Sequence, residues 1–184
     1  LSLLKQKYVR SREDVGIRMP KVGEAFNRCY ESLPFPLTGA QKRVITEIRN
    51  DMKSGRQMNR LLQGDVGSGK TAVAAALCAV AAQNGFQSAL MAPTEILAEQ
   101  HFNTFTKINE NSGIKCGLLT GSMTAKQKAK IKTELSQGEI DVIIGTHALL
   151  TDDVNFNNLG LVITDEQHRF GVAQREKLTK KGEN

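Results

Sequence analysis

Apolar residues in this chain fall into two kinds of segment that alternate along the sequence. Short, mostly apolar runs predict buried strands, and they cover residues 60–63, 88–92, 116–119, 140–144 and 159–163. Helical spacing or runs of helix formers predict helices, of which the clearest cover 38–48, 72–82, 94–105 and 124–137. Strands without a polar face that alternate with helices indicate an α/β domain, with a mainly parallel sheet and helices on both faces.

Capping residues mark the limits of several of these helices. Thr38 can accept a hydrogen bond from the first turn of its helix, and Gln41 stands where a capping box needs it. Thr94 can cap the predicted helix over 94–105 in the same way. Asn84-Gly85 ends the alanine-rich helix over 72–82, because glycine tolerates the left-handed conformation that follows a helix.

Residues 1–33 differ from the rest and predict a helical lead-in with a break at Met19-Pro20. Its two stretches each place apolar residues on one helical face: Leu1, Leu4 and Tyr8 in the first, and Val22, Phe26 and Cys29 in the second. Neither stretch can bury such a face without a partner. We therefore expect a lead-in over 1–33 that comes from a missing upstream domain, followed by one globular domain over 34–184.

The strand over 60–63 and the alanine-rich helix are joined by a phosphate-loop motif, Gly64-Asp65-Val66-Gly67-Ser68-Gly69-Lys70-Thr71. Its glycines let backbone N–H groups close around an anion, and the helix N-terminus adds partial positive charge. Lys70 can reach the terminal phosphates, and Thr71 can place its hydroxyl on Mg²⁺. A glycine turn with a purely structural role is the alternative, but the strand before and the helix after argue against it. The chain is predicted to bind a nucleoside triphosphate.

Two adjacent acids, Asp165 and Glu166, follow the last predicted strand. In a phosphate-loop sheet this is where the Mg²⁺ shell needs a carboxylate, so Asp165 would hold the metal beside Thr71. Glu166 would orient and deprotonate the attacking water. Adjacent acids also occur as plain surface charge, and a small-molecule kinase has no need of this pair. The placement at a strand end favours a nucleotide hydrolase.

The 184 residues suffice for one ordinary domain, and their charge is unevenly placed. Residues 1–60 hold 13 basic and 6 acidic residues, whereas residues 61–184 hold 12 and 13. A basic first segment is compatible with nucleic acid or with an acidic neighbouring domain. The series Lys126, Lys128, Lys130 and Lys132 adds nothing, because successive members point about 200° apart around a helix and predict a solvated surface.

Cysteine usage and hydropathy exclude other classes of protein. Cys29, Cys78 and Cys116 are scattered and form no C-x-x-C pair, which suits reduced thiols better than a disulfide scaffold or a zinc site. No apolar stretch is long enough to cross a lipid bilayer. The first residues lack the features of a secretory signal. We expect a cytoplasmic protein without a membrane partner.

Together the motifs resemble the first RecA-like domain of superfamily 2 helicases, and within them the RecG family of bacterial DNA helicases. Six segments carry the resemblance: a Q-type motif at 33–41, motif I at 64–74, motif Ia at 92–101, motif Ib at 119–122, the segment 144–149, and motif II with its continuation at 165–172. The lead-in is covered only loosely. The resemblance implies a RecA-like P-loop NTPase fold with ATP and Mg²⁺ as ligands.

The same resemblance implies roles for individual residues. Gln41 would read the adenine edge, and Phe35 would lie near the base unless it belongs to the core. His168 would lie at the nucleotide site and couple it to DNA contacts or to a partner domain. The DNA-facing residues would be Pro93, Thr94, Gly121, Thr146 and His147.

For the whole protein, the resemblance implies ATP-driven movement along branched or duplex DNA, with remodelling of stalled forks and Holliday junctions in recombination and repair. Partner domains would be a second RecA-like domain with an arginine finger and a wedge domain. The chain stops before motif III is expected. Because an arginine finger is worth about 10³–10⁵ in turnover, we expect the isolated piece to bind ATP weakly and barely hydrolyse it.

Three other functions remain open from the sequence. The motor of the transcription-repair coupling factor is similar, but it typically has a different residue at the positions of Ser68 and Gln167. A nucleotide-dependent DNA-binding switch would gain nothing from a poised base at Glu166. An RNA helicase of the same superfamily would differ in its substrate.

Overall fold

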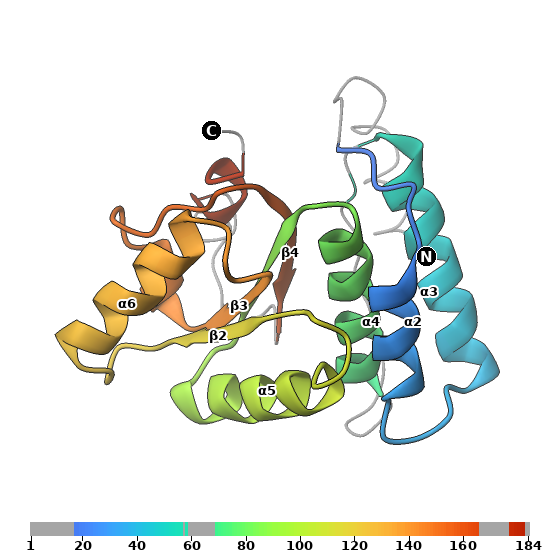
Figure 1. Cartoon of the computed structure of the whole chain (residues 1–184), viewed down its shortest axis with the longest axis horizontal. Helices are drawn as coiled ribbons and strands as arrows, with labels where there is room; N and C mark the ends of the chain where they lie inside the picture. The colour runs from blue at the N-terminus through green and yellow to red at the C-terminus, as the bar shows by residue number, and fades with distance from the viewer. Residues whose placement is uncertain (1–16, 57, 59–68, 166–176, 183–184) are drawn as a thin grey trace, which may run out of the picture.

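The computed structural model describes residues 17–56, 58, 69–165 and 177–182 (Figure 1). Its elements, in chain order, are α2 (Glu24–Glu31), α3 (Gly39–Ser54), α4 (Lys70–Gln83), β1 (Gln87–Met91), α5 (Glu95–Ile108), β2 (Cys116–Leu119), α6 (Ala125–Ser136), β3 (Val142–Gly145), the 3₁₀ helix η2 (His147–Leu150) and β4 (Leu159–Thr164). Each agrees with a predicted strand or helix to within a few residues, except η2, which had no sequence prediction. The predicted strand over 60–63 lies outside the described residues, so it stays a prediction.

The described strands form one parallel sheet in the order β2-β3-β1-β4. β1 is buried at every position, as a strand covered on both faces should be. β2 lies at one edge of this described sheet and alternates between half-buried and buried residues. Gly145 shows how closely these strands approach: a Cβ built on it would lie 2.3 Å from the backbone oxygen of Leu119. The predicted parallel sheet is confirmed.

Helices cover both faces of the sheet (Figure 1), and alternate residues of β1 divide between two apolar clusters. Leu90 belongs to the cluster that includes residues of α2, α3, α4 and α5, here called the α4 cluster. Ala89 and Met91 belong to the other cluster, with Leu135 of α6 and Leu149 of η2. Helix α4 is apolar nearly all round, because it is enclosed between the sheet and the outer helices α2 and α3.

The second stretch of the predicted lead-in packs on the domain itself. Phe26 and Cys29 are buried in the α4 cluster, and the Cys29 thiol lies 3.8 Å from the Ala75 oxygen as a weak donor. Val22 was expected on the same face, but it precedes α2 and is 41% exposed. The prediction for Val22 was therefore wrong, because the helix begins only after Gly23. The first predicted stretch, with Leu1, Leu4 and Tyr8, lies outside the described residues and stays a prediction.

The predicted caps are present. Thr38 accepts a hydrogen bond from the Gln41 backbone while the Gln41 side chain accepts one from Thr38, which completes the capping box. Thr94 accepts from the backbone N–H of Leu97 at 3.2 Å. Thr124 forms a second capping box with Gln127, which was not predicted from the sequence.

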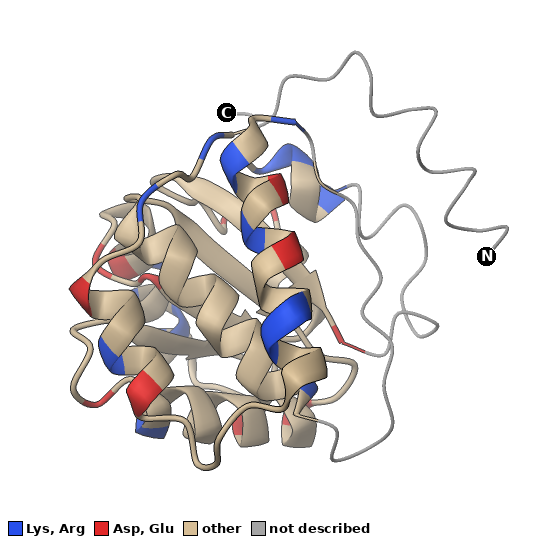
Figure 2. Cartoon of the chain, turned by 90° about the vertical axis from the view of Figure 1, so that its right-hand side faces the viewer, with Lys and Arg blue, Asp and Glu red and all other residues tan. Residues whose placement is uncertain are grey.

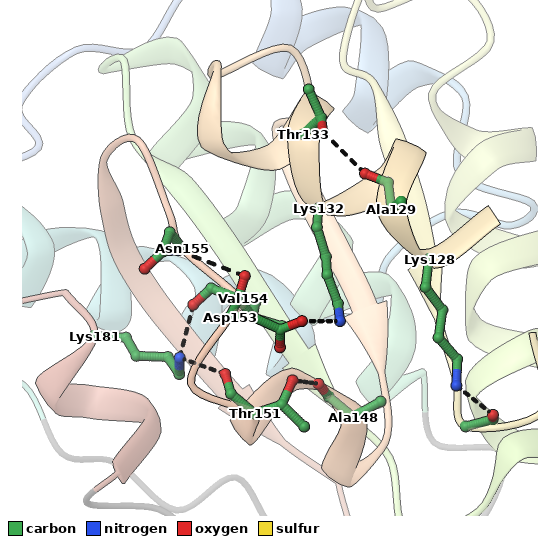
Figure 3. A network of polar contacts seen from close by, with 11 residues as sticks. Lys128, Ala129, Lys132, Thr133, Ala148, Thr151, Asp153, Val154, Asn155 and Lys181 are labelled. Atoms are coloured by element: carbon green, nitrogen blue, oxygen red, sulfur yellow. Dashed lines mark hydrogen bonds and ion pairs between the residues drawn. The ribbon is translucent and has the colours of Figure 1, made fainter. Parts of the chain in front are cut away.

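Basic residues form no continuous patch on α3. Figure 2 shows acidic and basic residues interspersed there, and they are Lys42, Arg43, Glu47, Arg49, Asp51 and Lys53. Around α6 the lysines point to different partners (Figure 3): Lys128 donates to the Gly121 oxygen at 2.6 Å, and Lys132 pairs with Asp153 at 2.5 Å. These two lysines are therefore held by partners, and the Lys132 side chain is only 22% exposed, so the predicted solvated surface does not extend to them. Among the described helices, none combines the length and apolarity that a membrane crossing requires.

A short loop after η2 is fixed by lysines from two directions (Figure 3). The Lys181 ammonium donates to the oxygens of Thr151 at 2.9 Å and Val154 at 2.7 Å. Lys132 of α6 reaches Asp153 of the same loop. The segment 177–182 is thereby held against the η2 side of the sheet, where Leu178 is fully buried.

Candidate active site

The carboxyl ends of the four described strands bring the predicted chemistry to one edge of the sheet. Met91 of β1 pairs with Gly145 of β3 and Thr164 of β4, so these strands end level with one another. Leu119 of β2 pairs with Gly145 in the same register. The residues predicted to act follow these ends directly: Pro93 and Thr94 after β1, Gly121 after β2, Thr146 and His147 after β3, and Asp165 after β4. In parallel sheets ligands bind outside this edge.

The N-terminus of α4 points to the same edge. Only residues 84–86 separate α4 from β1, so the C-terminus of α4 lies by the amino end of β1. Helix α4 also contacts β1 and β4 and therefore runs back along the sheet. Gly69 is the N-cap of α4, with φ +82°, and Lys70 and Thr71 form its first turn. A helix N-terminus at this edge supplies the partial positive charge and N–H groups that a phosphate needs.

Gln41 lies directly against this helix start. A Cβ built on Gly69 would lie 2.1 Å from Gln41 Nε2, so a side chain at position 69 would displace this amide. Gln41 Oε1 accepts from the Thr38 backbone N–H at 2.9 Å, as the capping box requires. The capping box therefore orients the amide group toward Gly69. The sequence predicted both the cap and a nucleotide role for Gln41, but not this contact.

Asp165 is held by a histidine from α5. His101 Nε2 lies 2.7 Å from Asp165 Oδ2, and the two side chains are 16% and 30% exposed. An ionised carboxylate can only accept a hydrogen bond, so Nε2 carries the proton. The backbone N–H of Asp165 donates to the Met91 oxygen at 2.9 Å, which extends the pairing of β1 and β4 by one residue. Both the backbone and the side chain of Asp165 are thus fixed.

Glu95 joins the segment after β1 to the segment after β2. Its Oε1 accepts from the Ser122 backbone N–H at 2.9 Å, and hydrogen bonds from Ser122 hold the pKa of the Glu95 carboxyl below its usual range. Lys128 holds the carbonyl of Gly121 from the other side. The 121–122 loop, in which Gly121 was predicted to face DNA, is therefore fixed by two charged side chains.

The remaining predicted site residues differ in exposure, and some lie outside the described residues. Thr146 is 7% exposed and precedes η2, whereas His147 is exposed and Pro93 is half-buried. Phe35 is 48% exposed, which excludes the alternative that it belongs to the core. Several predicted site residues lie outside the described residues, and their roles stay predictions: Gly64, Gly67, Ser68, Glu166 and His168.

The donor set at this edge suits a metal held largely by water and phosphate. Among the described residues, no cluster of three or more His, Cys, Asp or Glu side chains could form an all-protein metal site. Mg²⁺ keeps several waters and is usually bound through one or two carboxylates together with substrate phosphates. A single carboxylate, Asp165, with the Thr71 hydroxyl fits that pattern.

No role was predicted from the sequence for His101 or Glu95. A signal for His101 was present: it lies three residues after Ala98 and four before Phe105, and both of these are fully buried. Helical spacing therefore turns His101 toward the sheet. The only signal for Glu95 was weak: it is an acid directly after an N-cap, and an acid there usually interacts with the positive end of the helix dipole.

Comparison with known proteins gives a consistent picture. The family model described as DEAD/DEAH box helicase matches residues 38–183. The chain is 54% identical over 169 residues to the ATP-dependent DNA helicase RecG of Bacillus subtilis, covering 92% of this chain and 25% of that protein. It is 53% identical over 183 residues to RecG of Thermotoga maritima, covering 99% and 24%. The chain thus spans about a quarter of the length of these relatives, and the RecG resemblance expected from the motifs is confirmed.

Solved structures agree. A structure of RecG bound to a three-way DNA junction matches with a TM-score of 0.78 at 49% identity, over 92% of this chain and 23% of that one. A DEAD box protein from Methanococcus jannaschii matches with a TM-score of 0.65 at 20% identity, over 93% and 46%. The second match shows the RecA-like fold alone, and it does so at low sequence similarity.

Proposed function

The chain belongs to the DEAD/DEAH box helicase family, and we propose that it is the ATP-binding motor domain of a DNA helicase that remodels branched DNA. The observation that carries this proposal is the 53–54% identity to RecG helicases over nearly the whole chain. The arrangement of Gly69, Gln41 and Asp165 supports it. In a motor of this kind, ATP hydrolysis would drive movement along stalled forks and Holliday junctions.

At the nucleotide, the chain's residues would divide the work by position. The phosphate loop from Gly64 to Thr71 would surround the phosphates, with Lys70 reaching the terminal ones. Thr71 and Asp165 would hold Mg²⁺, which when bound neutralises charge that develops on the transferred phosphate. Glu166 would orient the attacking water and take its proton. Gln41 and Phe35 would contact the adenine, and His168 would couple the site to its surroundings.

DNA would bind along the carboxyl edge of the sheet. Its contacts would be Pro93, Thr94, Gly121, Thr146 and His147, which all follow strand ends. A second RecA-like domain with an arginine finger and a wedge domain would complete the motor. Without them, the chain would bind ATP weakly and hydrolyse it at a rate lower by about 10³–10⁵.

Two substitutions test this function. In this chain, Lys70→Ala should abolish binding of a fluorescent ATP analogue, which wild type should bind in the presence of Mg²⁺. In the longer protein that carries the chain, Glu166→Gln should keep ATP binding and lose unwinding of a branched DNA substrate.

The outcomes separate the competing functions. A nucleotide-dependent switch would keep its DNA-binding output in the Glu166→Gln variant, and that result would contradict a motor. Preference for duplex RNA over a branched DNA junction in direct competition would indicate an RNA helicase. Absence of Mg²⁺-dependent nucleotide binding by wild type would remove the proposal altogether.

A further inference from the structure

Helix α5 contacts two functional parts of this edge at once. Near its start Glu95 binds the 121–122 loop, and six residues later His101 binds Asp165. We infer that His101 is a positioning residue that fixes the Asp165 carboxylate for the nucleotide, and that α5 thereby couples the 121–122 loop to the nucleotide site. This inference rests on the proposed function, since it takes Asp165 as the carboxylate that meets the nucleotide-bound metal.

The contact between His101 and Asp165 is suited to orienting a side chain. It joins residues 64 positions apart at 2.7 Å, and the imidazole is only 16% exposed. Ala98 and Phe105, on the same face of α5, are fully buried and fix the rotation of the helix. A metal-binding carboxylate that is itself hydrogen-bonded is held in one orientation, and partners of this kind are typically worth about 10- to 100-fold in metal affinity or activity.

The other contact of α5 is equally defined. Glu95 accepts from the Ser122 backbone, and Glu95 Oε1 would lie 3.2 Å from a Cβ built on Gly121. Lys128 fixes the Gly121 carbonyl in the same loop. A displacement of the 121–122 loop therefore acts on the first turn of α5 directly.

Between these two contacts α5 is a short, unbroken segment of helix packed on the sheet. Six residues of helix span about 9 Å, and no helix-breaking residue stands between Glu95 and His101. Helix α5 also contacts β2 and β3 along the sheet. Energetic coupling between two sites needs a packed element that both sites contact, and α5 meets that requirement.

Paired substitutions at His101 test the positioning role. His101→Gln places an amide nitrogen close to the position of Nε2, whereas His101→Asn is too short to reach Asp165. We expect His101→Asn to weaken Mg²⁺-dependent binding of a fluorescent ADP analogue by about 10- to 100-fold, and His101→Gln to stay near wild type. With EDTA in place of Mg²⁺, all three proteins should bind alike. Asn103→Ala, at an exposed position of α5, is the matched control and should not change either affinity.

The α5 link is tested by nitrogen NMR of the imidazoles, because the chain has only 3 histidines. Glu95→Ala should shift the His101 signals. Glu99→Ala, which is closer to His101 along the helix but exposed, should leave them in place. Equal shifts in both variants, or none in either, would show that α5 does not carry the coupling.

The possible results also separate this inference from the proposed function. If wild type and His101→Asn bind with the same Mg²⁺-dependent affinity, the positioning role is overturned while the ATP-binding function stands. Loss of binding in both His101 variants, with unchanged circular dichroism and thermal midpoint, also overturns it, because the amide should rescue. No Mg²⁺-dependent binding by wild type removes both.

Discussion

Gly69 is the residue at which the backbone of the phosphate loop meets the Q-type motif. Its φ of +82° is unfavourable for any residue with a Cβ, and the space a Cβ needs is filled by Gln41 Nε2. The backbone conformation restricts this position to glycine, and any added side chain would also have to displace the Gln41 amide. A substitution here disturbs both the helix start and the amide that caps α3.

Gly69→Ala should accordingly cost more than its backbone conformation alone. Gly85→Ala is the matched control, because Gly85 has φ +81° but nothing lies within 4 Å of the place its Cβ would take. We expect Gly85→Ala to lower the free energy of unfolding by about 1–2 kcal/mol and to leave nucleotide affinity unchanged. Gly69→Ala should lose at least as much stability and also most of its nucleotide binding. Urea unfolding and titration with a fluorescent ATP analogue measure the two effects, and similar nucleotide affinities for both variants would contradict the steric argument.

At this scale the sequence predicts local contacts and misses distant ones. The Thr38–Gln41 capping box follows from spacing, because both partners lie in one helical turn. The contacts of Gln41 with Gly69 and of His101 with Asp165 depend on how whole helices are placed on the sheet. No single-sequence pattern encodes that placement, so these pairs needed the structure.

Helices α3 and α6 offer a comparison at the scale of elements, because each begins with the same kind of capping box. In both, a threonine side chain accepts from the third residue and a glutamine side chain accepts from the threonine backbone. The two boxes differ in what the glutamine touches. Of the two glutamines, it is Gln41 that also lies against the phosphate loop at Gly69.

Thr38→Ala and Thr124→Ala should therefore destabilise the protein similarly but differ in function. Each removes one N-cap acceptor and should cost about 1 kcal/mol in the free energy of unfolding. Thr38→Ala should in addition weaken nucleotide binding, because the Gln41 backbone N–H loses its hydroxyl acceptor and the first turn of α3, which positions Gln41, is held less firmly. Thermal unfolding with nucleotide titration checks this, and a loss of affinity in Thr124→Ala as large as in Thr38→Ala would point to a global effect.

The elements themselves were largely predictable, with physical reasons for the exceptions. The strand over 88–92 is apolar because the sheet is covered on both faces there. Helix η2 was missed, because four residues are too few for a helical period to show. Helix α2 was placed slightly early, since Val22 is apolar but precedes the helix.

Across the whole molecule, the three cysteines lie on three different elements that pack into one core. Cys29 lies on α2, Cys78 on α4 and Cys116 on β2, and each packs in or against the α4 cluster. Burial raises the pKa of each thiol from 9.0 to about 12. Since the thiolate is the reactive form, native thiols at pH 8 should be nearly inert.

Labelling with a thiol reagent should thus report global unfolding. At pH 8 the native protein should react slowly, and in urea all 3 cysteines should react rapidly. The raised pKa also links stability to pH: the folded state holds these protons more tightly, so stability is full below about pH 9 and falls as the pH rises toward 12. A urea midpoint unchanged between pH 8 and pH 11 would contradict the effect of burial, and fast labelling of the native protein would do so as well.

The fold class was predictable from the whole sequence because alternating apolar strands and helices leave few arrangements. The parallel order β2-β3-β1-β4 and the division of helices between two faces needed coordinates. The edge of the sheet that gathers the site followed from the parallel topology, since Thr94, Gly121, Thr146 and Asp165 each follow a strand end.

The approach of β3 to β2 at Gly145 limits how far this part of the gene can diverge. Any amino-acid change from a glycine codon adds a Cβ, and here that atom would lie 2.3 Å from a main-chain oxygen that cannot rotate away. Gly39, where nothing lies within 4 Å, is under no such restriction. Neutral drift should therefore be open at the start of α3 and closed at the end of β3, whichever substrate the protein has come to act on.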